Sequence, residues 1–101
     1  MDDSDRMNAD RDREAAILLY AELIAEAQAL GAALLDRDGD EARFRAALIA
    51  GLARSRDLSG IATLAEDLGR RLAEARDRPA IGVGASYERL SRALDRLLDD
   101  A

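Results

Sequence analysis

Apolar residues recur at intervals of three and four over most of the chain, the spacing that places side chains on one face of a helix. The first such run extends from Asn8 or Asp10 to about Asp36 and predicts one long helix. It carries two adjoining apolar stripes. The first stripe consists of Ala16, Leu19, Leu23, Ala27, Leu30 and Leu34, and the second of Ile17, Tyr20, Ile24, Gly31 and Leu35. Because so broad an arc needs more than one neighbour, we expect a homo-oligomer, with an interface at Ile17, Tyr20, Ile24 and Leu35.

The segment Asp36–Asp40 reads as a turn, in which Gly39 supplies a left-handed residue and Asp40 caps the next helix. The second helix is expected to bury Phe44, Ala47, Leu48, Gly51 and Leu52. Its pattern weakens between residues 55 and 60, where Asp57 or Ser59 can cap a further helix. The pattern leaves open whether residues 40–77 form one helix or two.

A narrow stripe follows and predicts another helix. It consists of Ile61, Leu64, Ala65, Leu68, Leu72 and Ala75. Support is expected from ion pairs four residues apart, namely Glu66 with Arg70, Asp67 with Arg71 and Glu74 with Arg78. Pro79 bars continuation of this helix.

These elements predict an all-α protein, a helical hairpin or bundle of three to four helices that is oligomeric. The expected organisation is an acidic flexible N-terminus at 1–8, a bundle core at 9–78, a hinge at 79–86 and an amphipathic helix at 87–101. Composition agrees, because the chain has a single Pro and 3% aromatic residues, whereas sheet cores favour β-branched and aromatic side chains.

The chain has no Cys and no His, which removes thiolate nucleophiles, imidazole bases and the commonest metal ligands. We therefore predict no catalytic residue, no metal site, no cofactor and no enzymatic activity. The N-terminus is acidic without an apolar segment, and the longest uncharged runs are short for a bilayer. We predict a cytoplasmic protein with no membrane partner.

Three short motifs resemble functional sites, and each has a simpler structural explanation. The acidic turn at 36–40 lacks the spacing and the twelfth-position acid of a calcium loop. Gly82-Val83-Gly84 lacks the third glycine and the preceding strand of a dinucleotide loop. Residues 64–69 resemble the first helix of a helix-turn-helix, but the apolar stripe continues through Gly69, which favours an uninterrupted helix.

The net charge of −6 argues against a general nucleic-acid binder, and all 15 basic residues are Arg. The second helix is the basic one. Its arginines are Arg43, Arg45, Arg54 and Arg56. These residues can complement the acidic first helix, which is the favoured interpretation, or make weak, sequence-independent DNA contacts that are lost as salt rises.

The C-terminal stripe is strongly apolar for its length. It consists of Tyr87, Leu90, Leu94, Leu97 and Leu98. A short helix on a tether is marginal alone, so its leucines must bury against the bundle, a neighbouring subunit or an external protein. We favour the external protein, which makes this helix the expected partner-binding element.

Two segments resemble the small terminase subunits of tailed phages and gene transfer agents. Residues 18–31 are similar to the first helix of that family's oligomerisation hairpin, and Arg78-Pro79-Ala80 with residues 87–98 is similar to its Pro-led return helix. Together they cover about a third of the chain. These residues include no counterpart of the family's N-terminal DNA-binding domain, and the middle segment, 40–78, is expected to be helical, so sequence-specific DNA recognition is not expected.

The resemblance implies a non-enzymatic, ring-forming adaptor that bridges DNA and a large terminase motor during DNA packaging. The alternative is a small helical regulator, of the antitoxin or anti-activator type, that masks a protein target with an amphipathic helix. A ring of many subunits favours the adaptor, and a dimer favours the regulator.

Overall fold

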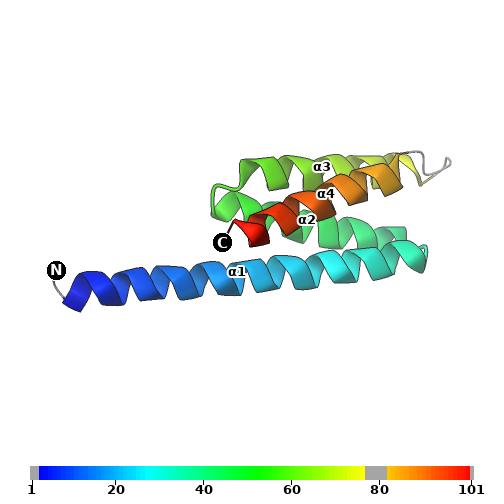
Figure 1. Cartoon of the computed structure of the whole chain (residues 1–101). Coiled ribbons are helices and arrows are strands. Elements are labelled where there is room, and N and C mark those ends of the chain that lie inside the picture. The colour runs from blue at the N-terminus through cyan, green and yellow to red at the C-terminus, as the bar shows by residue number, and fades with distance from the viewer. Residues whose placement is uncertain (1–2, 77–81, 101) are drawn as a thin grey trace.

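The computed structural model describes residues 3–76 and 82–100, and it is all-α (Figure 1). Its helices are α1 (Asp3–Leu35), α2 (Gly39–Ser55), α3 (Ser59–Glu74) and α4 (Val83–Asp99). No strand occurs within these ranges. The segment 40–77, left open by the sequence, therefore contains two helices, and the expected helical bundle is confirmed.

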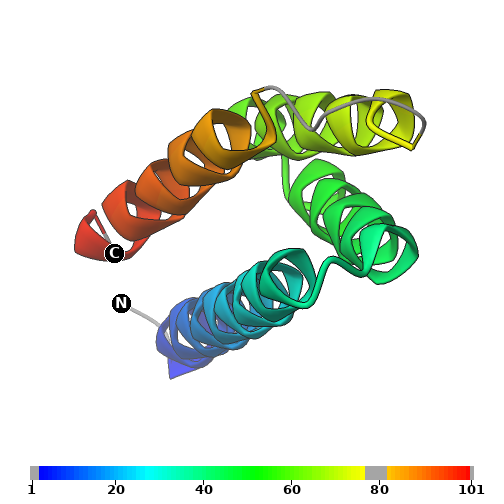
Figure 2. The ribbon, with the colours of Figure 1, turned by 90° about the vertical axis from the view of Figure 1, so that its right-hand side faces the viewer.

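The helices follow one another side by side, and the molecule is elongated, with extents of 59 × 20 × 20 Å. Seen end on, α1, α2, α3 and α4 follow one another around the core, and α4 also contacts α1 (Figure 2). α1 is the longest helix, and its N-terminal half projects beyond the other three (Figure 1).

The first helix begins at Asp3 and not near Asn8 or Asp10, so residues 3–8 belong to α1, while residues 1–2 lie outside the described part. Residues 6–14 are all exposed, so this arm has no tertiary support.

Two matching turns connect the first three helices. The backbone N–H of Asp38 donates to the carbonyl of Ala33 at 2.9 Å, and that of Leu58 donates to Ala53 at 2.8 Å. Each turn holds one non-glycine residue in the left-handed region, Arg37 at φ 57° and Asp57 at φ 59°. This is the Schellman ending of a helix, with Arg and Asp where glycine is usual.

The predicted capping residues are wrong at both turns. Asp38, not Asp40, caps α2, because its carboxylate accepts a hydrogen bond from the Glu41 backbone at 3.1 Å, and Gly39 is already helical. α3 begins after Leu58, which cannot cap through its side chain, so neither Asp57 nor Ser59 serves as the N-cap.

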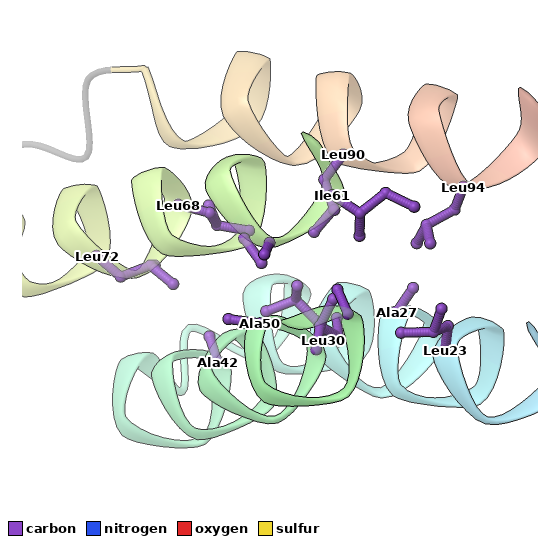
Figure 3. Close-up of a cluster of buried hydrophobic side chains, with 14 of the residues drawn as sticks. Leu23, Ala27, Leu30, Ala42, Ala50, Ile61, Leu68, Leu72, Leu90 and Leu94 are labelled. Carbon is purple, nitrogen blue, oxygen red and sulfur yellow. The ribbon is translucent and has the colours of Figure 1, made fainter. Parts of the chain in front are cut away.

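The core lies inside the curve of the four helices (Figure 3). α3 contributes the predicted residues Ile61, Ala65, Leu68 and Leu72. The face predicted for α2 is wrong except at Leu52, which is partly buried against the core. The buried residues of α2 are Ala42, Ala46, Ile49, Ala50 and Ala53. Since α2 packs between α1 and α3, small side chains on its inner face allow both neighbours to approach, and the larger Phe44 and Leu48 lie outside.

α4 begins at Val83, so the predicted hinge at 79–86 is wrong for residues 83–86, and residues 79–81 lie outside the described part. Gly82 precedes the helix with φ 84°, a conformation that L residues rarely adopt. A Cβ at this position would also lie 2.7 Å from Nη1 of Arg71. The positive φ therefore favours glycine where the chain enters α4.

Candidate functional site

The described residues contain no group of three or more Asp, Glu, Cys or His side chains placed to hold a metal ion. An open hollow lies where the turn after α1 meets the end of α3 and the start of α4. Three of its charged residues form a cluster: Oδ1 of Asp40 accepts from Arg43 at 2.5 Å and from Arg76 at 3.0 Å. These hydrogen bonds, first from Arg76 and then from Arg43, hold the pKa of Asp40 below its ordinary value.

Three of the four arginines predicted to contact nucleic acid are engaged by carboxylates of the same chain. Arg43 binds Asp40, Arg45 binds Glu26 and Glu41, and Arg54 binds Glu66. For Arg56, the described side chains provide no ion-pair partner. The four residues do not form one basic surface, because Arg45 lies toward α1 and Arg54 toward α3.

Arg45 links the acidic first helix to the basic second one. Its Nη1 donates to Oε2 of Glu26 at 2.9 Å, and its Nε donates to Oε1 of Glu41 at 2.7 Å. Hydrogen bonds to Glu26 and then to Glu41 raise the pKa of Arg45 above its ordinary value. The guanidinium also lies 5.5 Å from the centre of the Phe44 ring, within the range of a cation–π contact. This interhelical pair is the structural use that the sequence favoured for the basic residues.

The predicted oligomer interface divides into two parts. Tyr20 and Ile24 are partly buried and pack against the core of their own chain. Ile17 and Leu35, by contrast, are 57% and 87% exposed. The structure therefore does not bring these four residues together on one free surface.

The predicted partner-binding helix is docked on the bundle. Leu90 and Leu94 are fully buried between α3 and α1 (Figure 3), and Tyr87 and Leu97 are partly buried. The prediction that this stripe is free for a partner is therefore wrong for Leu90 and Leu94. Only Leu98 has an exposed side chain. The open curve of α1 to α3 explains the docking, because without α4 the inner leucines of α1 and α3 would face water.

A tyrosine and a glycine fit together where α4 crosses α1. The hydroxyl of Tyr87 donates to the carbonyl of Ala27 at 3.3 Å. A Cβ on Gly31 would lie 2.5 Å from that hydroxyl oxygen, so Gly31 makes room for the ring. The sequence placed Gly31 in an apolar stripe and could not identify the residue that needs the space.

Asp67 anchors α4 to α3 through polar contacts. Its Oδ2 accepts from Nε of Arg71 at 2.9 Å and from Oγ of Ser86 at 3.1 Å, and Arg89 lies 3.7 Å away. Ser86 is the one fully buried polar residue among those described. The hydrogen bond from Arg71 lowers the pKa of Asp67, and partial burial opposes that shift. Oδ1 of Asp67 also accepts from Nη2 of Arg70 at 2.9 Å, so both carboxylate oxygens are engaged and this cluster is a structural latch. The predicted pair of Asp67 with Arg71 is confirmed, whereas Glu66 pairs with Arg54 instead of Arg70.

The side of α2 that faces away from the core carries an uncharged stripe, which we call the α2 outer stripe. It consists of Phe44, Ala47, Leu48 and Gly51. Phe44 is 54% exposed and Leu48 is 37% exposed. The sequence identified these residues but placed them inside, because it favours the larger side chains for the core. A signal for the opposite choice was present, since the alanines of α2 also recur at helical spacing.

Residues 6–35 of α1 form the one helix, within the described residues, long and apolar enough by length and composition to cross a bilayer. The expectation that the apolar runs of the chain are too short for a bilayer is therefore wrong for α1. Only 28% of its most apolar window is buried inside the molecule, where Leu23 and Leu30 are fully covered.

Comparisons of the chain with protein-family models, with curated proteins and with solved structures give no match.

Proposed function

We propose that this protein is a non-enzymatic helical interaction module that binds an amphipathic helix of a protein partner along the α2 outer stripe. The observation that carries the proposal is the exposure of Phe44 and Leu48 on a surface with no charged residue between them. Aligned large apolar side chains in contact with water are unfavourable unless a partner covers them, and such patches commonly mark interaction sites.

The shape of the stripe suits a helix. Phe44 and Leu48 are one turn apart, and Ala47 and Gly51 beside them have minimal side chains. A Cβ at Gly51 would meet no atom within 4 Å, so the backbone there is open to close approach. A partner helix could therefore place large apolar residues over Ala47 and Gly51 and pack its small residues around Phe44.

Charge at the edges of the stripe is already balanced within the chain. Arg43 is paired with Asp40 on one edge, and Arg45 is paired with Glu41 on the other. A charged partner would have to compete with these ion pairs. Recognition is therefore expected to depend on apolar shape, with only a modest effect of salt on the dissociation constant.

The narrower version of the proposal is a subunit like the small terminases, and it rests on the sequence resemblance alone. In that version the large terminase would supply the partner helix, now at α2 instead of the C-terminal helix. Because Arg43, Arg45 and Arg54 hold carboxylates, DNA contact would require breaking ion pairs. Any DNA binding is therefore expected to be weak, sequence-independent and lost as salt rises.

The test is affinity enrichment from the source cell, with wild-type protein compared with Phe44→Glu and with the matched surface control Ala73→Glu. Ala73 is exposed on α3, outside the stripe. We expect the same partner with wild type and with the control, and at least a tenfold loss with Phe44→Glu. Equal recovery with all three proteins would contradict the proposal, provided that circular dichroism shows all three folded.

A further inference from the structure

The outer face of α1 carries a second uncharged surface, which we call the α1 seam. Its members alternate in steps of three and four residues, and every one is exposed. They are Leu18, Ala21, Ala25, Gln28, Ala32 and Leu35. This is the spacing of the contact positions of a coiled coil, and it extends along about 25 Å of helix. The core face of α1, with Leu19, Leu23 and Leu30, lies on the other side of the same helix.

We propose that a second copy of this chain covers the α1 seam, with the two α1 helices antiparallel about a two-fold axis between Ala25 and Gln28. The seam is self-complementary in this arrangement. Leu18 faces Leu35 of the partner subunit, Ala21 faces the partner's Ala32, and Ala25 faces the partner's Gln28. Leucines close both ends, and alanines in the middle let the helix backbones approach closely.

The ends of the seam carry most of its apolar surface. Leu18 is 71% exposed and Leu35 is 87% exposed in the single chain. Dimerisation would remove four such leucines from water, two at each end. Gln28 is the only polar residue of the seam, and near the two-fold axis its amide can hydrogen-bond the equivalent amide of the partner. One polar residue in an otherwise apolar seam is a known determinant of register.

Charge decides between antiparallel and parallel pairing. The next seam positions toward the N-terminus are Glu14 and Arg11, both exposed. Parallel pairing would place each of them against its own copy, a like-charge contact. In antiparallel pairing, the exposed residues 6–14 of one copy run past the turn between α1 and α2 of the other copy. Glu14 then comes within reach of the partner's Arg37. Along the seam edge, Glu22 then lies opposite the partner's Ala29, so no like charges meet there.

This inference rests on the proposed function only in treating the chain as an interaction module, since it uses a different face. Sedimentation equilibrium at micromolar concentrations should give twice the chain mass of 10.9 kDa for wild type and for Ala73→Glu. Ala25→Glu should raise the dissociation constant of the dimer at least tenfold, because it places two carboxylates at the axis. Phe44→Glu should leave the dimer intact, so loss of partner binding and loss of the dimer are separable.

Orientation is tested by oxidative cross-linking, which is unambiguous because the chain has no Cys. Chains with Ala21→Cys and chains with Ala32→Cys should cross-link when mixed and not when alone, and Ala73→Cys should cross-link with neither. A wild-type monomer at 100 micromolar, an assembly larger than a dimer, or an unaffected Ala25→Glu would overturn the proposal. So would cross-linking of Ala21→Cys to itself, or uptake of the protein onto neutral lipid vesicles in place of dimerisation.

Discussion

At the residue scale, the turns after α1 and α2 each hold one non-glycine residue, Arg37 or Asp57, in the left-handed backbone region that such residues rarely adopt. Asp57 occupies the C′ position of a Schellman motif at φ 59°, where glycine carries no steric penalty. The sequence could not reveal this, because it placed a capping aspartate there and left open whether the helix was broken at all. The turn is set instead by the packing of α2 against both α1 and α3.

Substitution at Asp57 should therefore reveal how much the left-handed backbone of a non-glycine residue costs the folded protein. Asp57→Gly is expected to be neutral or to raise the free energy of unfolding slightly, and Asp57→Ala to lower it, with a difference of about 1 kcal/mol between the two variants. Urea titration followed by circular dichroism measures both. If alanine proves as stable as glycine, the left-handed conformation of this residue is wrong.

The latch at Asp67 makes a pH-dependent prediction. Its pKa is lower in the folded protein than its ordinary value of 3.8, so its contribution to stability is fully present above about that pH. The contribution is then lost as the pH falls through the lower, folded pKa. Asp67→Asn should therefore lower the midpoint of thermal unfolding at neutral pH and should flatten its dependence on pH below about 4.

Ser86→Ala is the matched control for this latch, because it removes one hydrogen-bond donor to Asp67 and keeps the carboxylate with Arg71. It should destabilise the protein less at neutral pH than Asp67→Asn and should retain the acid-dependent loss. The same pH profile for wild type and Asp67→Asn would show that the carboxylate does not stabilise the fold.

At the element scale, the buried face of a helix could be predicted best where the apolar residues form one clear stripe. The α3 stripe was assigned correctly because Ile61, Leu68 and Leu72 share one face, with charged residues opposite. The first stripe predicted for α1 is also the covered one, since Leu19, Leu23 and Leu30 are buried. α2 is apolar on more than one side, so periodicity identified this helix but not which side is covered. The position of α2 between α1 and α3 decides which side is covered, and it cannot be read from the sequence of α2 alone.

The C-terminal helix is the clearest change of role, from a free partner-binding element to part of the core. Leu90→Ala should lower the free energy of unfolding by about 2–5 kcal/mol, because it leaves a cavity between α4 and the helices beneath it. Leu98→Ala should cost less than about 1 kcal/mol, since that side chain is exposed. Removal of everything after Arg78 should likewise destabilise the bundle.

Equal stability of Leu90→Ala and Leu98→Ala would contradict this docking. It would restore the sequence-based prediction that α4 is free to bind an external partner. Chemical denaturation with both variants side by side distinguishes the two outcomes, because each removes the same atoms from the same helix.

At the scale of the whole molecule, two uncharged outer faces lie on adjacent helices, the α2 outer stripe and the α1 seam. The all-α class was predictable from composition and spacing, whereas these faces were not, because they appear only once the inner faces are assigned. A closed two-fold dimer through α1 would favour the regulator over the ring-forming adaptor, since an isologous pair has no free seam left for further subunits.

The central claim, that the protein acts through these outer faces, is tested most directly by site-specific photo-cross-linking in the source cell. A photoreactive amino acid is placed at Phe44, at Ala25 or at the exposed control Ala73 in three separate proteins. We expect a heterologous protein adduct from position 44, an adduct of twice the chain mass of 10.9 kDa from position 25, and neither from position 73. The absence of adducts at positions 44 and 25, or the same adducts from all three positions, would contradict the account.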